Sequence, residues 1–95
     1  MSAYVIAEID VVDPAAYEDY RKQVLVVVTK YGGRFLVRGG TVHPKEGGWA
    51  PKRIVVLEFP TMAQAQKFYD SPEYAPLIKL RQKASKGKLI LVEGA

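Results

Sequence analysis

The stretch Lys52–Gln64, with the sequence KRIVVLEFPTMAQ, contains the clearest strand in the chain, and a helix start follows it directly. Residues 52–59 are rich in β-branched and apolar side chains, which predicts a strand, and Pro60 ends it. Thr61 and Gln64 have the spacing of a capping box at the start of a helix. A strand that leads at once into a capped helix points to a mixed α and β fold.

The flanking sequence repeats this pairing of strand and helix. Strands are predicted at 3–11, 34–38, 52–59 and 88–93, and helices at 14–31, 62–70 and 71–85. Asp13-Pro14 reads as an N-cap followed by the first helical residue, and Gly87 is expected to end the last helix. The order β-α-β-β-α-β predicts a ferredoxin-like α+β fold with a four-stranded antiparallel sheet covered by helices on one face. Residues 1–95 are expected to form a single domain.

The two faces of the predicted sheet differ in character, because side chains alternate along a strand. One face is wholly apolar and is expected to lie under the helices: Val5, Ala7, Ile9, Val11, Phe35, Val37, Val55, Leu57 and Phe59. The other mixes apolar and charged side chains: Tyr4, Ile6, Glu8, Asp10, Arg34, Leu36, Arg38, Ile54, Val56 and Glu58. That second face is too apolar for open water and too charged for a core.

We therefore expect a two-fold homodimer in which two sheets face each other. The apolar contact residues of this face would be Tyr4, Ile6, Leu36, Ile54 and Val56. The alternative is a monomer with scattered exposed aliphatic side chains, which are individually normal on a protein surface.

Four blocks of sequence carry a family resemblance. They are YGGRFLVRGG at Tyr31–Gly40, EGGWAPKR at Glu46–Arg53, Glu58–Pro60, and Ser71–Tyr74 together with Arg81. In these blocks, which span nearly the whole chain, the sequence resembles the domain-of-unknown-function family 1330. The resemblance implies the dimeric α+β barrel fold and a homodimer, but no established activity.

Arg38 and Arg81 are the cations best suited to hold an organic anion, because a guanidinium group binds a carboxylate in bidentate fashion. Arg81 falls within the apolar arc of its predicted helix, and Arg38 ends a predicted strand. The alternative for each is a structural ion pair with an acid. Tyr20 and Tyr74, on helix faces turned toward the sheet, and Trp49, in the loop at 41–51, are expected to complete the ligand site.

Glu8, Glu58 and His43 are the candidates for acid–base catalysis. Burial would raise the pKa of either carboxyl group and favour a general base, whereas a neighbouring arginine would lower it. His43 is the only histidine and lies in a loop, so we expect no metal site. No cofactor is expected either. If the protein is an enzyme, analogy of fold points to a cofactor-independent monooxygenase or isomerase.

Composition narrows the location and the partners. The chain has no cysteine, no apolar run long enough to cross a membrane and no secretory signal pattern, so a cytoplasmic location is expected. Its net charge is +4, with basic residues concentrated late in the chain at Lys79, Arg81, Lys83, Lys86 and Lys88. Cations are favoured near a helix C-terminus in any case, so we do not expect nucleic-acid binding.

The leading hypothesis is a protein that binds a small organic anion between helices and sheet, with acid–base conversion of that anion as an option. The first alternative is a non-catalytic dimeric binding or stress module. The second is an RNA-binding domain, because RNA recognition motifs have the same order of strands and helices.

Overall fold

A computed structural model describes all 95 residues and has the predicted β-α-β-β-α-β order, with the second helical region divided in two. The strands are β1 (Ala3–Val11), β2 (Arg34–Arg38), β3 (Arg53–Phe59) and β4 (Ser85–Glu93). The helices are α1 (Pro14–Lys30), α2 (Met62–Tyr69) and α3 (Ala75–Ala84). The fold is the ferredoxin-like α+β fold that the sequence predicts.

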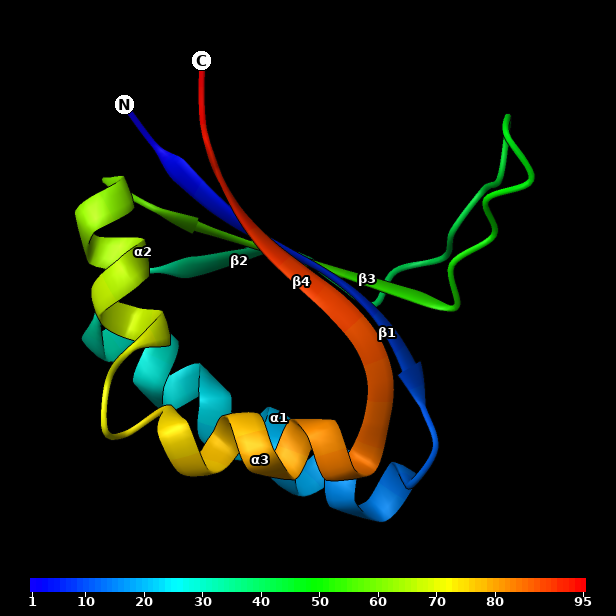
Figure 1. Cartoon of the computed structure of the whole chain (residues 1–95), viewed down its shortest axis with the longest axis horizontal. Helices are drawn as coiled ribbons and strands as arrows, with labels where there is room; N and C mark the ends of the chain where they lie inside the picture. Colours follow the sequence, from blue (N-terminus) through cyan, green and yellow to red (C-terminus); the bar gives the residue numbers. More distant parts are fainter.

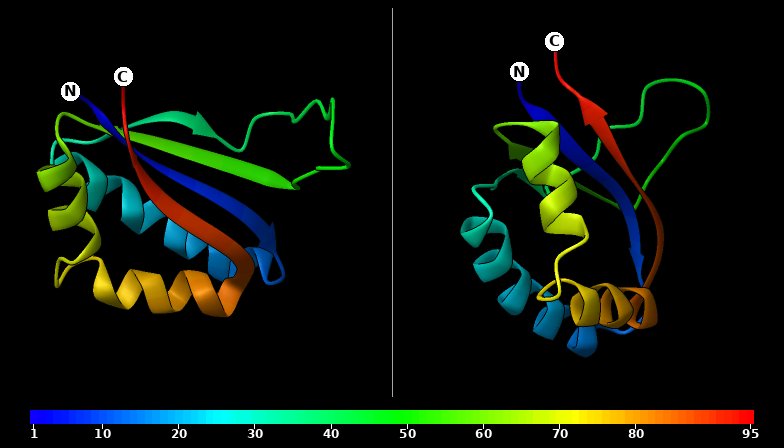
Figure 2. Two further views of the ribbon diagram at one scale, coloured as in Figure 1. Left: turned by 45° about the horizontal axis from the view of Figure 1, so that its top comes forward. Right: turned by 60° about the vertical axis from the view of Figure 1, so that its left-hand side comes forward.

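The four strands form one antiparallel sheet in the order β2-β3-β1-β4, so the first and third strands are central. All three helices lie on one side of this sheet, and the long loop between β2 and β3 extends away from them (Figure 1). The two termini lie side by side (Figure 2), where the amide of Gly94 donates to the carbonyl of Ser2. No helix is both long and apolar enough to cross a membrane.

Two of the three predicted helix starts form as expected, whereas α3 begins at Ala75, four residues later than predicted. The Asp13 side chain accepts a hydrogen bond from the Ala16 amide at 3.2 Å, with Pro14 in the first turn of α1. The Thr61 hydroxyl accepts from the Gln64 amide at 3.2 Å and donates to the Gln64 side chain at 3.3 Å. These caps satisfy backbone donors that a helix start otherwise leaves unpaired.

The core lies between the helices and the inner face of the sheet. Its three largest fully buried side chains form an aromatic cluster, in which the Phe68 ring centroid lies 5.1 Å from that of Phe59 and 4.3 Å from that of Tyr74. This cluster fixes the position of Tyr74 at the start of α3.

The turn that leads into α3 is tied to the end of α1. Glu73 accepts hydrogen bonds from the Lys30 ammonium group and from the Tyr31 hydroxyl, the latter at 2.8 Å. These bonds lower the pKa of Glu73 to about 2, so its carboxylate keeps its charge at neutral pH. Ser71 caps the same turn, because its hydroxyl accepts from the Tyr74 amide.

The role predicted for Gly87 is wrong, although the last helix ends within one residue of its predicted bound. Helix α3 ends at Ala84, and β4 begins at the next residue, so Gly87 lies inside a strand opposite Ile9. A Cβ atom on Gly87 would lie 2.1 Å from the carbonyl oxygen of Glu8. Gly87 is therefore required for the close approach of β1 and β4, rather than for ending a helix.

The predicted faces of Val37 and Arg38 are also wrong. The pairing of β2 with β3 is regular at Arg34–Glu58 and then shifts, so that Val37 rather than Leu36 lies opposite Val56. This bulge adds one residue and exchanges the faces that follow it. Arg38 consequently turns to the helix-covered side of the sheet, and Val37 turns to the open side.

Candidate functional site

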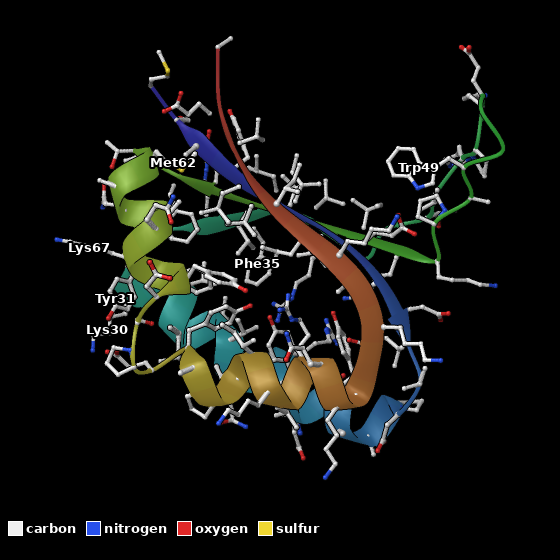
Figure 3. All side chains as sticks on the ribbon, in the orientation of Figure 1. Lys30, Tyr31, Phe35, Trp49, Met62 and Lys67 are labelled. Carbon is white, nitrogen blue, oxygen red and sulfur yellow. The ribbon has the colours of Figure 1, made fainter.

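A cleft opens between the inner face of the sheet and helices α1 and α3. Its enclosed volume is only about 30 Å³, and the figure rises to about 450 Å³ when the open mouth and the gaps between side chains are counted. Of its 15 lining residues, 11 are hydrophobic. The apolar lining comes from all four strands and from α1: Val5, Ala7, Ile9, Val24, Phe35, Val55, Leu57 and Leu89. Figure 3 shows Phe35 between the sheet and the helices, in this interior.

Four arginines line the cleft, each from a different element: Arg21 on α1, Arg38 on β2, Arg53 on β3 and Arg81 on α3. No aspartate, glutamate, histidine or lysine is among the lining residues. Only Arg21 has a carboxylate partner, Glu18, at 3.0 Å. The other three form no salt bridge. Within the single chain, neither Arg38 nor Arg81 forms the structural ion pair that was the alternative for each.

Arg38 is held in the cleft wall by neutral contacts. Its Nη2 donates to the carbonyl oxygen of Arg21 at 2.8 Å, and its guanidinium carbon lies 4.2 Å from the centroid of the Phe35 ring. Burial lowers the pKa of Arg38, and the positive charges of Arg21 and Arg53 lower it further. The guanidinium keeps its charge at neutral pH, because the ordinary pKa of arginine lies far above neutrality.

Arg53 has unused hydrogen-bonding capacity. Its guanidinium carbon lies 5.3 Å from the centroid of the Tyr17 ring, and its Nε is buried with no hydrogen-bond partner. Buried donors are normally satisfied, so an unpaired one beside a cleft is a place where a ligand oxygen fits. Gly39 makes room for this arrangement, since a Cβ there would lie 2.1 Å from Nη1 of Arg53.

Arg81 is the most enclosed cation, with only 7% of its surface exposed. Near it, the hydroxyl groups of Tyr20 and Tyr74 form a hydrogen bond of 2.8 Å. Burial raises the pKa of both tyrosines, although the Arg81 charge opposes the rise. Both hydroxyls therefore stay protonated at neutral pH. The hydrogen bond between them uses one of the two hydroxyl protons, so the other hydroxyl proton remains available to a ligand.

The side chains that line the cleft determine what it can do chemically. Guanidinium and tyrosine groups donate hydrogen bonds and stabilise negative charge, while the apolar walls exclude water from them. The lining contains no carboxylate, imidazole or amine side chain that could accept a proton at neutral pH. The cleft is thus equipped to bind and orient an anion.

Four of the five ligand-site residues predicted from sequence lie together here: Arg38, Arg81, Tyr20 and Tyr74. Trp49 does not join them. It lies on the loop between β2 and β3, far from the helices (Figure 3), with 60% of its surface exposed. Its Nε1 donates to Oε1 of Glu8 at 3.0 Å.

None of the three predicted catalytic residues lines the cleft. Glu8 accepts a hydrogen bond from Trp49 of the loop. His43 is exposed and belongs to no group of three or more metal-ligating side chains. Glu58 accepts hydrogen bonds from Arg34 at 2.7 Å and from Tyr4 at 3.3 Å. These bonds, with Arg34 the main cause, lower the pKa of Glu58 and make it a weaker base.

Sequence reasoning missed Arg21 and Arg53. Arg53 lies two residues before Val55 on β3, so strand alternation alone places it on the apolar inner face. Arg21 follows Tyr17 by four residues on α1, which places it next to the buried stripe of that helix. Both signals were present in the sequence, but each arginine also fits an ordinary exposed position.

The fold defines a small ferredoxin-like α+β protein, and the comparisons with known proteins agree with this fold. The model of the family described as Domain of unknown function (DUF1330) matches residues 2–95, and the chain belongs to that family. No curated protein matches it.

Among solved structures, the chain is similar to the RPA0582 protein of unknown function from Rhodopseudomonas palustris. The TM-score is 0.75 at 17% identity, over 99% of this chain and 82% of that one. It is also similar to SnoaB, a cofactor-independent oxygenase from Streptomyces nogalater. The TM-score there is 0.67 at 13% identity, over 99% of this chain and 93% of that one. At these identities the likeness shows the fold alone.

Proposed function

We propose that the cleft binds a small organic anion with an apolar body. The observation that carries this proposal is the presence of three arginines in the cleft wall with no carboxylate partner, of which Arg81 is buried and Arg38 and Arg53 are half-buried. An enclosed charge without a partner is destabilising. A ligand carboxylate would supply the missing counter-charge, and the aliphatic and aromatic walls would bury the rest of the molecule.

Binding without acid–base conversion is the form of this function that we favour. The catalytic candidates Glu8, Glu58 and His43 all lie outside the cleft, and the lining itself offers donors rather than a base. The non-catalytic binding module is therefore preferred to an acid–base enzyme. The lack of cysteine supports a cytoplasmic setting for it.

Calorimetric titration with a matched pair of probes tests the proposal. We expect 2-naphthoate to bind at least tenfold more tightly than its neutral analogue 2-naphthamide, because charge-assisted hydrogen bonds contribute about 1.5–3 kcal/mol each. Arg53→Met should weaken 2-naphthoate binding by about tenfold or more. Arg34→Met is the control, since Arg34 pairs with Glu58 away from the cleft. Equal binding of the two probes, or no binding of either, would contradict the proposal.

A backbone substitution probes the same site indirectly. Gly39→Ala is expected to weaken 2-naphthoate binding about as much as Arg53→Met, because the new methyl group would displace the Arg53 guanidinium. Because the φ of Gly39 is positive, at 75°, an alanine at this position would also strain the folded state by about 1 kcal/mol. Gly40→Ala is the control, since its Cβ meets no atom within 4 Å. Unchanged affinity in Gly39→Ala would mean that the position of Arg53 is unimportant.

We also propose that the open face of the sheet is the contact between two copies of the chain. Residues that are neighbours across the four strands form one apolar row: Ile90, Ile6, Val56 and Val37. Ile90, at one end of the row, is 57% exposed in the single chain. Leu36, next to Val37 at the other end, is 47% exposed. Arg34 and Glu58 form an ion pair at the border of this row. An apolar row with a charged border is typical of a self-complementary interface.

Sedimentation velocity tests the dimer. The wild-type protein is expected to sediment as a dimer at tens of micromolar, and Ile6→Lys as a monomer, because a lysine would be buried in the centre of the interface. Val26→Lys is the matched control on the exposed side of α1. A wild-type monomer at this concentration would refute the interface.

A further inference from the structure

We infer that the ligand is a dianion, with an oxyanion group at each end of an apolar body. This inference rests on the proposed function and specifies the class of anion that the cleft takes. It comes from the way in which the unpaired donors of the cleft divide into two groups.

The first group consists of Arg38 and Arg53. They lie on the neighbouring strands β2 and β3, and the charge of Arg53 acts on Arg38. Both have their guanidinium groups against aromatic rings of the cleft, those of Phe35 and Tyr17. The Nε atoms of Arg53 and of Arg21 are both buried without a hydrogen-bond partner, so this part of the cleft lacks an acceptor.

The second group consists of Arg81 and the tyrosine pair. Arg81 approaches from α3 and also lines a neighbouring cavity with residues of β1 and β4, among them Ile9 and Gly87. In the sheet order β2-β3-β1-β4 this is the side opposite to β2. The hydroxyl groups of Tyr20 and Tyr74 add a proton donor close to the Arg81 charge.

Counting charges shows what one anion leaves behind. The lining has four guanidinium groups, and Glu18 neutralises one of them, at Arg21. A ligand with a single carboxylate satisfies one donor group and leaves the other without a counter-charge. A ligand with two oxyanions neutralises both groups, while its apolar middle lies on the aliphatic walls between them.

The experiment compares two probes of nearly the same shape by calorimetry: naphthalene-2,6-dicarboxylate and its methyl half-ester, which carries one charge. The wild-type protein is expected to bind the diacid at least tenfold more tightly than the half-ester. In Arg81→Met we expect this ratio to fall below threefold, because the second donor group has lost its charge. Arg34→Met should keep the wild-type ratio.

The outcomes separate the two proposals. Equal wild-type affinities for diacid and half-ester would overturn the dianion inference and leave the proposed function in place. No binding of either probe would overturn the proposed function and the inference with it. The wild-type comparison needs no variant, so it decides the question even if Arg81→Met does not fold. A ratio above tenfold that persists in folded Arg81→Met would contradict the assignment of Arg81 to the second end.

Discussion

Replacing Arg81 with methionine is expected to stabilise the ligand-free protein by about 1 kcal/mol or more, as measured by urea denaturation at pH 7. Arg81 is buried, and no carboxylate neutralises it. Methionine keeps the unbranched apolar stem that packs in the core and removes the enclosed charge. A gain in stability together with a loss of diacid binding is the behaviour of a residue kept for a ligand.

The same substitution at a paired arginine provides the control. Arg34 forms an ion pair with Glu58 and is largely exposed, so Arg34→Met is expected to change stability by less than about 1 kcal/mol. If Arg81→Met instead lowers the free energy of unfolding by 2 kcal/mol or so, Arg81 holds the fold together, and the ligand account of this residue is wrong.

Substituting Gly87 with alanine is expected to destabilise the protein by about 3 kcal/mol, the upper part of the usual range for overpacking. The added methyl group would lie 2.1 Å from the Glu8 carbonyl oxygen and 3.2 Å from Cδ1 of Ile9, so the central strand β1 and the edge strand β4 must separate. Thermal unfolding followed by circular dichroism measures the effect.

Gly40→Ala is again the matched control, because the space around Gly40 is open. It should unfold within about 0.5 kcal/mol of the wild type. If Gly87→Ala is equally stable, β1 and β4 do not approach each other at this point as closely as described. Because Gly87 also lines the cavity beside Arg81, a folded Gly87→Ala protein should bind the diacid more weakly.

The parts of the fold that sequence predicted are those set by local chemistry. Asp13 and Thr61 cap helices through bonds within a single turn, and the alternation of β1 and β3 decides which side chains face the helices. Gly87 was misjudged because a glycine after a helix and a glycine in a crowded strand look alike in sequence. Only the register of β1 against β4 distinguishes them.

The alternation of side chains along β2 could not predict the face of the sheet on which Arg38 lies, for a similar reason. A bulge in β2 depends on how two strands pair, and no residue of Phe35–Arg38 marks it. Arg81 was recognisable, because a cation in an apolar helical arc is unusual. The convergence of Arg21 and Arg53 on the same cleft required the tertiary structure, since each comes from a different element.

The central claim is that an organic anion binds in the cleft between sheet and helices. Methyl NMR spectra recorded during titration with 2-naphthoate test it most directly. We predict that the methyl resonances of Val24, Leu57 and Leu89, which line the cleft, shift with increasing ligand, while those of Ile90 and Val92 on the open face of the sheet do not. Shifts confined to Ile90 and Val92, or no shifts at all, would contradict the account.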